Sequence, residues 1–102
     1  MAQNSKVGAH KTAVYHDGTH TCVVYHHTCI ARFNSDEIIL DSGGWRTVTT
    51  KLRMNQASNQ YGLGFNVCQK DHVWYVDRGD PFDIRVFSDG MVITLEDRPW
   101  YR

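Results

Sequence analysis

The 102-residue sequence has no long apolar run, no excess of charge of one sign and no CxxC pair of cysteines. No apolar run approaches the ~20 residues that a membrane-spanning helix needs, and the first dozen residues lack the apolar centre of a signal peptide. Eleven basic and eleven acidic residues give a formal net charge of zero, which disfavours both a long basic groove for nucleic acid and an acidic mimic of DNA. We therefore expect a cytoplasmic protein without a membrane partner.

Cysteine is also scarce. Cys22, Cys29 and Cys68 are odd in number and do not form a standard metal-binding spacing. Reduced thiols in a cytoplasm are the simplest account of such a set. We expect the three side chains to pack as small apolar groups on strands.

The run of residues 20–29 contains several potential metal ligands, which are histidines and cysteines. Zinc requires three or four such groups to converge, usually from a turn or a helix, whereas this run has the composition of a strand, whose side chains alternate between two faces. His20, Cys22 and His26 are therefore predicted on one face, and His27 and Cys29 on the other. We predict no metal and no cofactor; the alternative is a site formed by His20, Cys22, His26 and Cys29.

Catalytic motifs are missing as well. A Cys–His pair is conceivable, but no glycine elbow precedes a cysteine and no expected helix begins with one. No motif places a nucleophile, a base and an orienting group together. We predict a protein that is not an enzyme, with a metal- or thiol-dependent enzyme as an alternative.

Most of the chain has the composition of antiparallel β-structure. Residues 1–11 are polar and aperiodic, so we predict a flexible N-terminus followed by one domain over 12–102. Asp17-Gly18, Lys70-Asp71 and Asp89-Gly90 each separate two β-rich runs, and each predicts a hairpin, the last joining 84–88 to 91–96. The other β-rich runs are 12–16, 21–27, 28–33, 37–42, 63–69 and 72–77, where 21–33 is either one bent strand or two.

One segment has helical character. The candidate N-caps are Thr47, Thr49 and Thr50, of which Thr49 and Thr50 are better placed. Gly62 is suited to end the helix. The apolar residues Met54, Ala57 and Tyr61 form a narrow stripe that can lie on a sheet. These signals predict one short helix at about 50–61 in a mostly antiparallel α+β protein of order β-β-β-α-β-β-β-β.

This helix carries an unusual number of Asn and Gln side chains beside two bases. Glu and Lys are commoner on a merely solvated helix face, whereas amides suit specific contacts. The alternative is a local role, in which Asn55 or Asn59 ties down the preceding loop or a neighbouring strand end. We predict that the following residues bind a partner: Trp45, Arg46, Lys51, Arg53, Asn55 and Gln56.

The same region resembles a group of small proteins encoded by tailed bacteriophages. The shared pattern is a YH-x-T strand end, a GGW-x-T-x-TTK-x-RMN segment, an NQ-x-GLG turn and a QK–WYV hairpin. It covers roughly residues 23–77, and 78–102 falls outside it. The matching residues here are Tyr25-His26 with Thr28, Gly43 to Thr47, Thr49 to Lys51, Arg53 to Asn55, Asn59 to Gly64, Gln69-Lys70 and Trp74 to Val76.

The resemblance implies a context and no activity. It implies a phage gene product in the cytoplasm of an infected bacterial host. We predict an interaction protein that binds a host or phage protein complex, such as an inhibitor of a host defence or transcription machine. The main alternative is a nucleic-acid-binding accessory protein, with Arg46, Lys51 and Arg53 on phosphates and the amides on base edges. The oligomeric state is left open.

Overall fold

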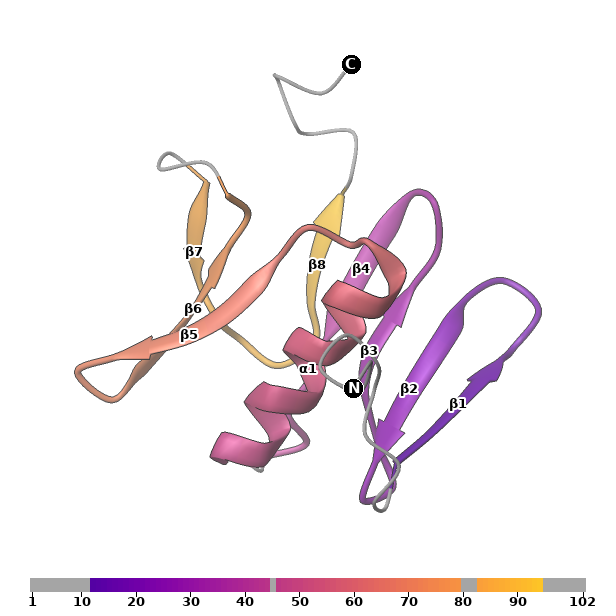
Figure 1. The fold of residues 1–102 in the computed structure, drawn as a ribbon, viewed down its shortest axis with the longest axis horizontal. Coiled ribbons are helices and arrows are strands. Elements are labelled where there is room, and N and C mark those ends of the chain that lie inside the picture. Colours follow the sequence, from indigo (N-terminus) through magenta and orange to yellow (C-terminus); the bar gives the residue numbers. More distant parts are fainter. Residues whose placement is uncertain (1–11, 45, 80–82, 95–102) are drawn as a thin grey trace.

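A computed structural model describes residues 12–44, 46–79 and 83–94 (Figure 1). Within these ranges the chain forms eight strands and a single helix, which confirms an α+β protein that is mostly antiparallel β-sheet. The elements are β1 (Thr12–His16), β2 (Thr21–Tyr25), β3 (Thr28–Phe33), β4 (Glu37–Leu40), α1 (Val48–Tyr61), β5 (Asn66–Lys70), β6 (Val73–Asp77), β7 (Ile84–Val86) and β8 (Met91–Thr94). This helix is not long and apolar enough to cross a membrane.

The strands form two separate sheets. The five-stranded sheet has the order β1-β2-β3-β4-β8, and the three-stranded sheet has the order β5-β6-β7. Helix α1 lies between the two sheets in Figure 1 and buries Met54 and Ala57 completely. Because side chains from both sheets contact the helix, one continuous core holds the molecule together.

The predicted hairpin at Asp89-Gly90 is wrong. β7 pairs with β6, whereas β8 pairs with β4, so the Asp89-Gly90 turn leads from one sheet to the other. The Asp89 carboxylate accepts hydrogen bonds from the backbone N–H and the hydroxyl of Ser42, both at 2.7 Å. An Asp-Gly turn specifies a local reversal of the chain but does not specify which strand the returning segment joins.

The segment 21–33 forms two strands, β2 and β3, joined by a tight turn at His26-His27. Both histidines have positive φ angles, of 50° and 71°. The pairing of β2 with β3 also shifts register between Val23 and Val24. Such a β-bulge places two residues of one strand opposite one of the other, which interrupts the simple alternation of faces.

Helix α1 begins at Val48, two residues before the predicted start at about residue 50. Thr47 has an extended backbone and its hydroxyl accepts a hydrogen bond from the Thr50 N–H at 3.2 Å, so Thr47 is the N-cap instead of Thr49 or Thr50. Thr50 is instead buried within the first turn. Gly62 ends the helix in the left-handed region, as its position predicted.

Aromatic residues anchor both sheets in the core. Trp74 and Phe65 are buried, and the Trp74 ring meets Phe87 edge-on at 5.4 Å between centroids. Tyr61, at the end of the predicted apolar stripe, packs against Phe33 but remains 37% exposed. The last turn of α1 therefore covers the edge of the core incompletely.

Candidate functional site

Helix α1 is attached to the three-stranded sheet through the free edge of β5. The Asn55 side chain accepts a hydrogen bond from the Val67 N–H at 2.7 Å and donates one to the Val67 carbonyl at 3.0 Å. Three residues further along the helix, the Ser58 hydroxyl accepts a hydrogen bond from the Phe65 N–H at 3.0 Å and donates one to the Phe65 carbonyl at 2.7 Å. These side chains take the place of a neighbouring strand and satisfy an edge that would otherwise be unpaired.

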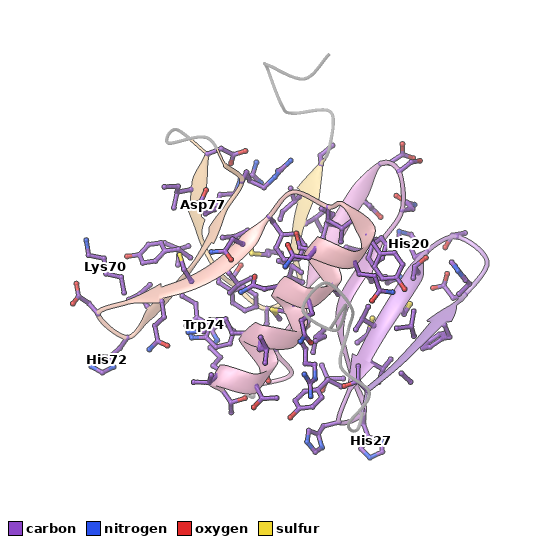
Figure 2. All side chains as sticks on the ribbon, viewed as in Figure 1. His20, His27, Lys70, His72, Trp74 and Asp77 are labelled. Carbon is purple, nitrogen blue, oxygen red and sulfur yellow. The ribbon has the colours of Figure 1, made fainter. Side chains whose placement is uncertain are left out.

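Two of the predicted site residues lie on aromatic rings of the core. The Arg46 guanidinium is 5.0 Å from the centre of the Phe87 ring and 6.0 Å from that of Trp74. The Lys51 ammonium is 5.7 Å from the centre of the Trp74 ring and donates a hydrogen bond to Gln69 at 3.2 Å. Figure 2 shows Trp74 beside the N-terminal half of α1. Cation–π contacts of this kind hold charged side chains in place while their polar ends stay near solvent.

A second contact, with the Asp89 carboxylate, also holds the Arg46 side chain in place. Its guanidinium lies 3.9 Å from the Asp89 carboxylate, and both side chains are partly exposed. Burial acts to raise the pKa of Asp89, but the hydrogen bonds from Ser42 and the nearby charge of Arg46 outweigh it and hold that pKa below its usual value. The carboxylate is thus kept charged beside Arg46.

Arg53 and Gln56 lie on the other flank of the helix. Arg53 donates a hydrogen bond to the Gln56 side chain at 3.1 Å, and its guanidinium lies 5.7 Å from the centre of the Tyr25 ring. Both side chains are half-buried. Trp45, the sixth predicted contact residue, lies outside the described residues.

Two exposed apolar residues lie between these flanks, and sequence reasoning missed them. Val48 is 74% exposed and Leu52 is 48% exposed. Since successive helix residues are ~100° apart, Val48 and Leu52 share a side opposite to the buried Met54 and Ala57. Their spacing of four residues was the available signal, because it marks a second apolar stripe that the core does not use.

We call these residues the α1 surface: Val48 and Leu52 at its centre, with Arg46, Lys51, Arg53 and Gln56 around them. The structure thus brings four of the six predicted residues to the borders of one exposed apolar pair. Asn55 lies beside them, but its amide is committed to β5.

The side chains of the histidine and cysteine run do not converge on one point in the described structure. In the described parts of the chain, no group of three or more His, Cys, Asp and Glu side chains could hold a metal ion. The expected alternation of faces is also wrong, because the turn at His26-His27 pairs Cys29 with Val24 and so places Cys29 on the same face as Cys22. Burial, with a further contribution from Cys22, raises the pKa of Cys29 to about 11. The Cys29 thiol is therefore protonated at neutral pH.

His20 joins the first hairpin to β4. One of its ring nitrogens lies 2.8 Å from the Thr19 hydroxyl and the other lies 2.8 Å from the Glu37 carboxylate. The turn itself is fixed by Asp17, whose carboxylate accepts hydrogen bonds from the backbone N–H groups of Thr19 and His20. These bonds lower the pKa of Asp17 to about 2. His20 thus has a structural position in which both nitrogens are engaged.

An open cleft of about 410 Å³ lies beside this hairpin. Its lining combines the rings of Phe33 and Tyr61 with the polar side chains of His16, Thr19 and Asn34. His16 and Asn34 both use polar atoms within the protein, His16 on the Thr21 hydroxyl and Asn34 on the Thr19 carbonyl and two backbone N–H groups. The cleft therefore lacks the converging polar groups that a small-ligand site presents.

The sequence profile of the Kyanoviridae Gp96 protein family matches residues 1–94. The chain belongs to this family, and it is a phage protein, as the resemblance over 23–77 implied. The match extends well beyond that segment and includes most of 78–102. No curated protein and no solved structure matches the chain.

Proposed function

We propose that this phage protein acts in the infected bacterium as a non-enzymatic binding protein that engages a host or phage protein complex through the α1 surface. An inhibitor of a host defence or transcription machine is the concrete form of this role. One observation carries the proposal: an exposed apolar pair on a helix is framed by bases that aromatic rings hold in place.

The composition of the α1 surface is that of a protein interface. Interfaces have an apolar centre and a polar rim, and arginine is enriched in them. Val48 and Leu52 supply the centre, and Arg46, Lys51 and Arg53 supply the rim. Since a side chain that is already held loses less freedom on binding, the contacts to Trp74, Phe87 and Tyr25 lower the entropic cost of association. The fitting partner is a protein surface with an apolar contact ringed by carboxylates.

The experiment compares two matched glutamate substitutions. Leu52 and Val92 are each 48% exposed, but Val92 lies on β8, away from the α1 surface. Tagged wild-type protein, Leu52→Glu and Val92→Glu are expressed in infected cells, and co-purifying proteins are identified by mass spectrometry. We expect one complex to be retained by wild type and Val92→Glu and lost by Leu52→Glu. A complex retained equally by Leu52→Glu and Arg53→Glu would refute the assignment of this surface.

A nucleic-acid-binding role is the second candidate, because three bases lie within the α1 surface. Two features argue against it. Trp74 and Phe87 are only 3% and 2% exposed, so they offer no ring on which a base could stack, and the centre of the surface is apolar. If the three bases contacted phosphates of a duplex, affinity would fall about 40-fold between 50 and 200 mM salt. Fluorescence anisotropy with labelled DNA and RNA measures this directly, and absence of binding at 50 mM salt eliminates this candidate.

A metal- or thiol-dependent enzyme is the third candidate carried by the sequence. Its residues are His20, Cys22, His26 and Cys29, of which Cys22 is buried and Cys29 has a raised pKa. Elemental analysis of the purified protein tests it, and stoichiometric zinc or iron would favour it over the binding role.

A further inference from the structure

The outer face of the three-stranded sheet is apolar and uncovered in the described structure. Its inner face buries Val67, Trp74 and Val76 in the core. Because side chains alternate along a strand, the residues between them point outward. Val73 is 38% exposed on this face, and on β7 Ile84 and Val86 are 51% and 61% exposed. We call this side of β5, β6 and β7 the outer face.

Two charged residues lie at opposite ends of the outer face. The strand register places Lys70 beside Val73 at one end, and Asn66, Asp77 and Ile84 together at the other. Figure 2 shows Lys70 near the β5–β6 turn and Asp77 at the far end of β6. Neither side chain forms an ion pair with another described residue. One Asp77 oxygen accepts the Gly79 N–H at 2.7 Å, which leaves the other for a partner.

We propose that the outer face binds a second copy of this chain, related by a two-fold axis that lies along the row of Cys68, Tyr75 and Val86. These three residues are cross-strand neighbours in the middle of the face. A two-fold axis along that row reverses the strands, so the end that carries Lys70 in one copy meets the end that carries Asp77 in the other. Because this axis keeps each strand over itself, Lys70 of one copy lies over Asn66 of the other, and Asp77 lies on the neighbouring strand. Strands are ~4.8 Å apart, so the long Lys70 side chain can reach that carboxylate. The dimer thereby contains two such charge pairs around an apolar centre, and its surface is self-complementary.

The charges also exclude the other face-to-face arrangement. A two-fold axis parallel to the strands leaves the strand direction unchanged, so each cross-strand row of one copy faces the same row of the other copy. Since β6 is the central strand of the sheet, such an axis over the middle of the face would place Asp77 of one copy directly over Asp77 of the other. Like charges facing each other across a contact are destabilising. Of these two axes, the strand-reversing one brings opposite charges together.

The size of the face sets the strength of the dimer. Stable interfaces bury about 800 Å² per partner, and three strands of three to five residues offer less than this area. We therefore expect a dimer that forms at high protein concentration, and sedimentation equilibrium between ~10 µM and ~1 mM covers the range. The expected mass rises from the monomer value of 11.8 kDa towards twice that value.

Charge exchange tests the arrangement. Lys70→Asp and Asp77→Lys should each weaken dimerisation about tenfold or more, because each change turns two attractive pairs into repulsive ones. The double variant restores opposite charges and should recover the dimer. A wild-type protein that remains monomeric at ~1 mM overturns the proposal, and so does a double variant that is no tighter than the single ones.

Cross-linking at Cys68 provides an independent readout. The proposed axis places Cys68 of one copy opposite Cys68 of the other, and packed sheets are separated by ~10 Å. A bismaleimide with a span of about 10 Å should link the two copies, and Cys68→Ser should abolish the product. Failure to cross-link under conditions where the dimer is present overturns this axis. Leu52→Glu should leave dimerisation unchanged, so this result is separate from the function proposed for the α1 surface.

Discussion

Replacing Asn55 by alanine tests how the helix is fastened to the three-stranded sheet. In the structure the Asn55 amide satisfies both backbone polar groups of Val67, at 2.7 and 3.0 Å, and Val67 itself is 2% exposed. Alanine removes both partners and leaves an N–H and a carbonyl at the β5 edge without a bond. Because water has little access there, these groups are not simply rehydrated.

The change in the free energy of unfolding caused by Asn55→Ala is the sum of two opposing contributions. A buried polar group that loses its partner costs about 1–3 kcal/mol, and two groups are affected. The higher helix propensity of alanine returns up to about 0.6 kcal/mol. We expect Asn55→Ala to lower the free energy of unfolding by about 2 kcal/mol, which corresponds to a fall in Tm of about 8–16 °C for a domain of this size.

Asn59→Ala is the matched control. Asn59 lies on the same helix and is exposed, and its side chain forms no hydrogen bond to another described residue. The substitution changes helix propensity in the same way, so the difference between the two variants isolates the bonds to Val67. Urea denaturation followed by circular dichroism measures both. A difference below about 0.5 kcal/mol would show that the β5 edge does not depend on this amide.

Three further predictions concern other parts of the fold. Gly43→Ala should destabilise the protein by about 1–3 kcal/mol, because Gly43 has a positive φ of 64° and an added Cβ would collide with the Thr28 side chain; thermal denaturation measures this. The pKa of Asp17 is lowered from 3.8 to about 2, so its contribution to stability is present above pH ~4 and is lost as the pH falls towards 2. Asp17→Asn should flatten the Tm profile between pH 4 and pH 2, and an unchanged profile would contradict the assignment. The raised pKa of Cys29 predicts slower alkylation at pH 8 than at Cys68, which peptide mapping after timed treatment with iodoacetamide measures; equal rates would contradict this prediction.

The sequence by itself determined the local elements. Runs of β-branched residues predicted the strands, Gly62 predicted the end of the helix, and the stripe of Met54 and Ala57 predicted its buried side. Each of these signals depends only on neighbouring residues. The amides of α1 were also recognisable as unusual from the sequence. Whether Asn55 faced a partner or a strand end was open, because both uses require the same side chain.

Tertiary structure decided the features that depend on distant segments. The Asp89-Gly90 turn looks the same in a hairpin and in a crossover between sheets, and the outcome depended on the pairing of β8 with β4, about fifty residues away. The two hydrogen bonds of the Asn55 amide depend on the unpaired edge of β5, which exists only because the sheet ends there. Likewise, Val48 and Leu52 are exposed because Met54 and Ala57 already fill the space between the sheets. Local sequence sets backbone preferences, whereas exposure and pairing are properties of the assembled chain.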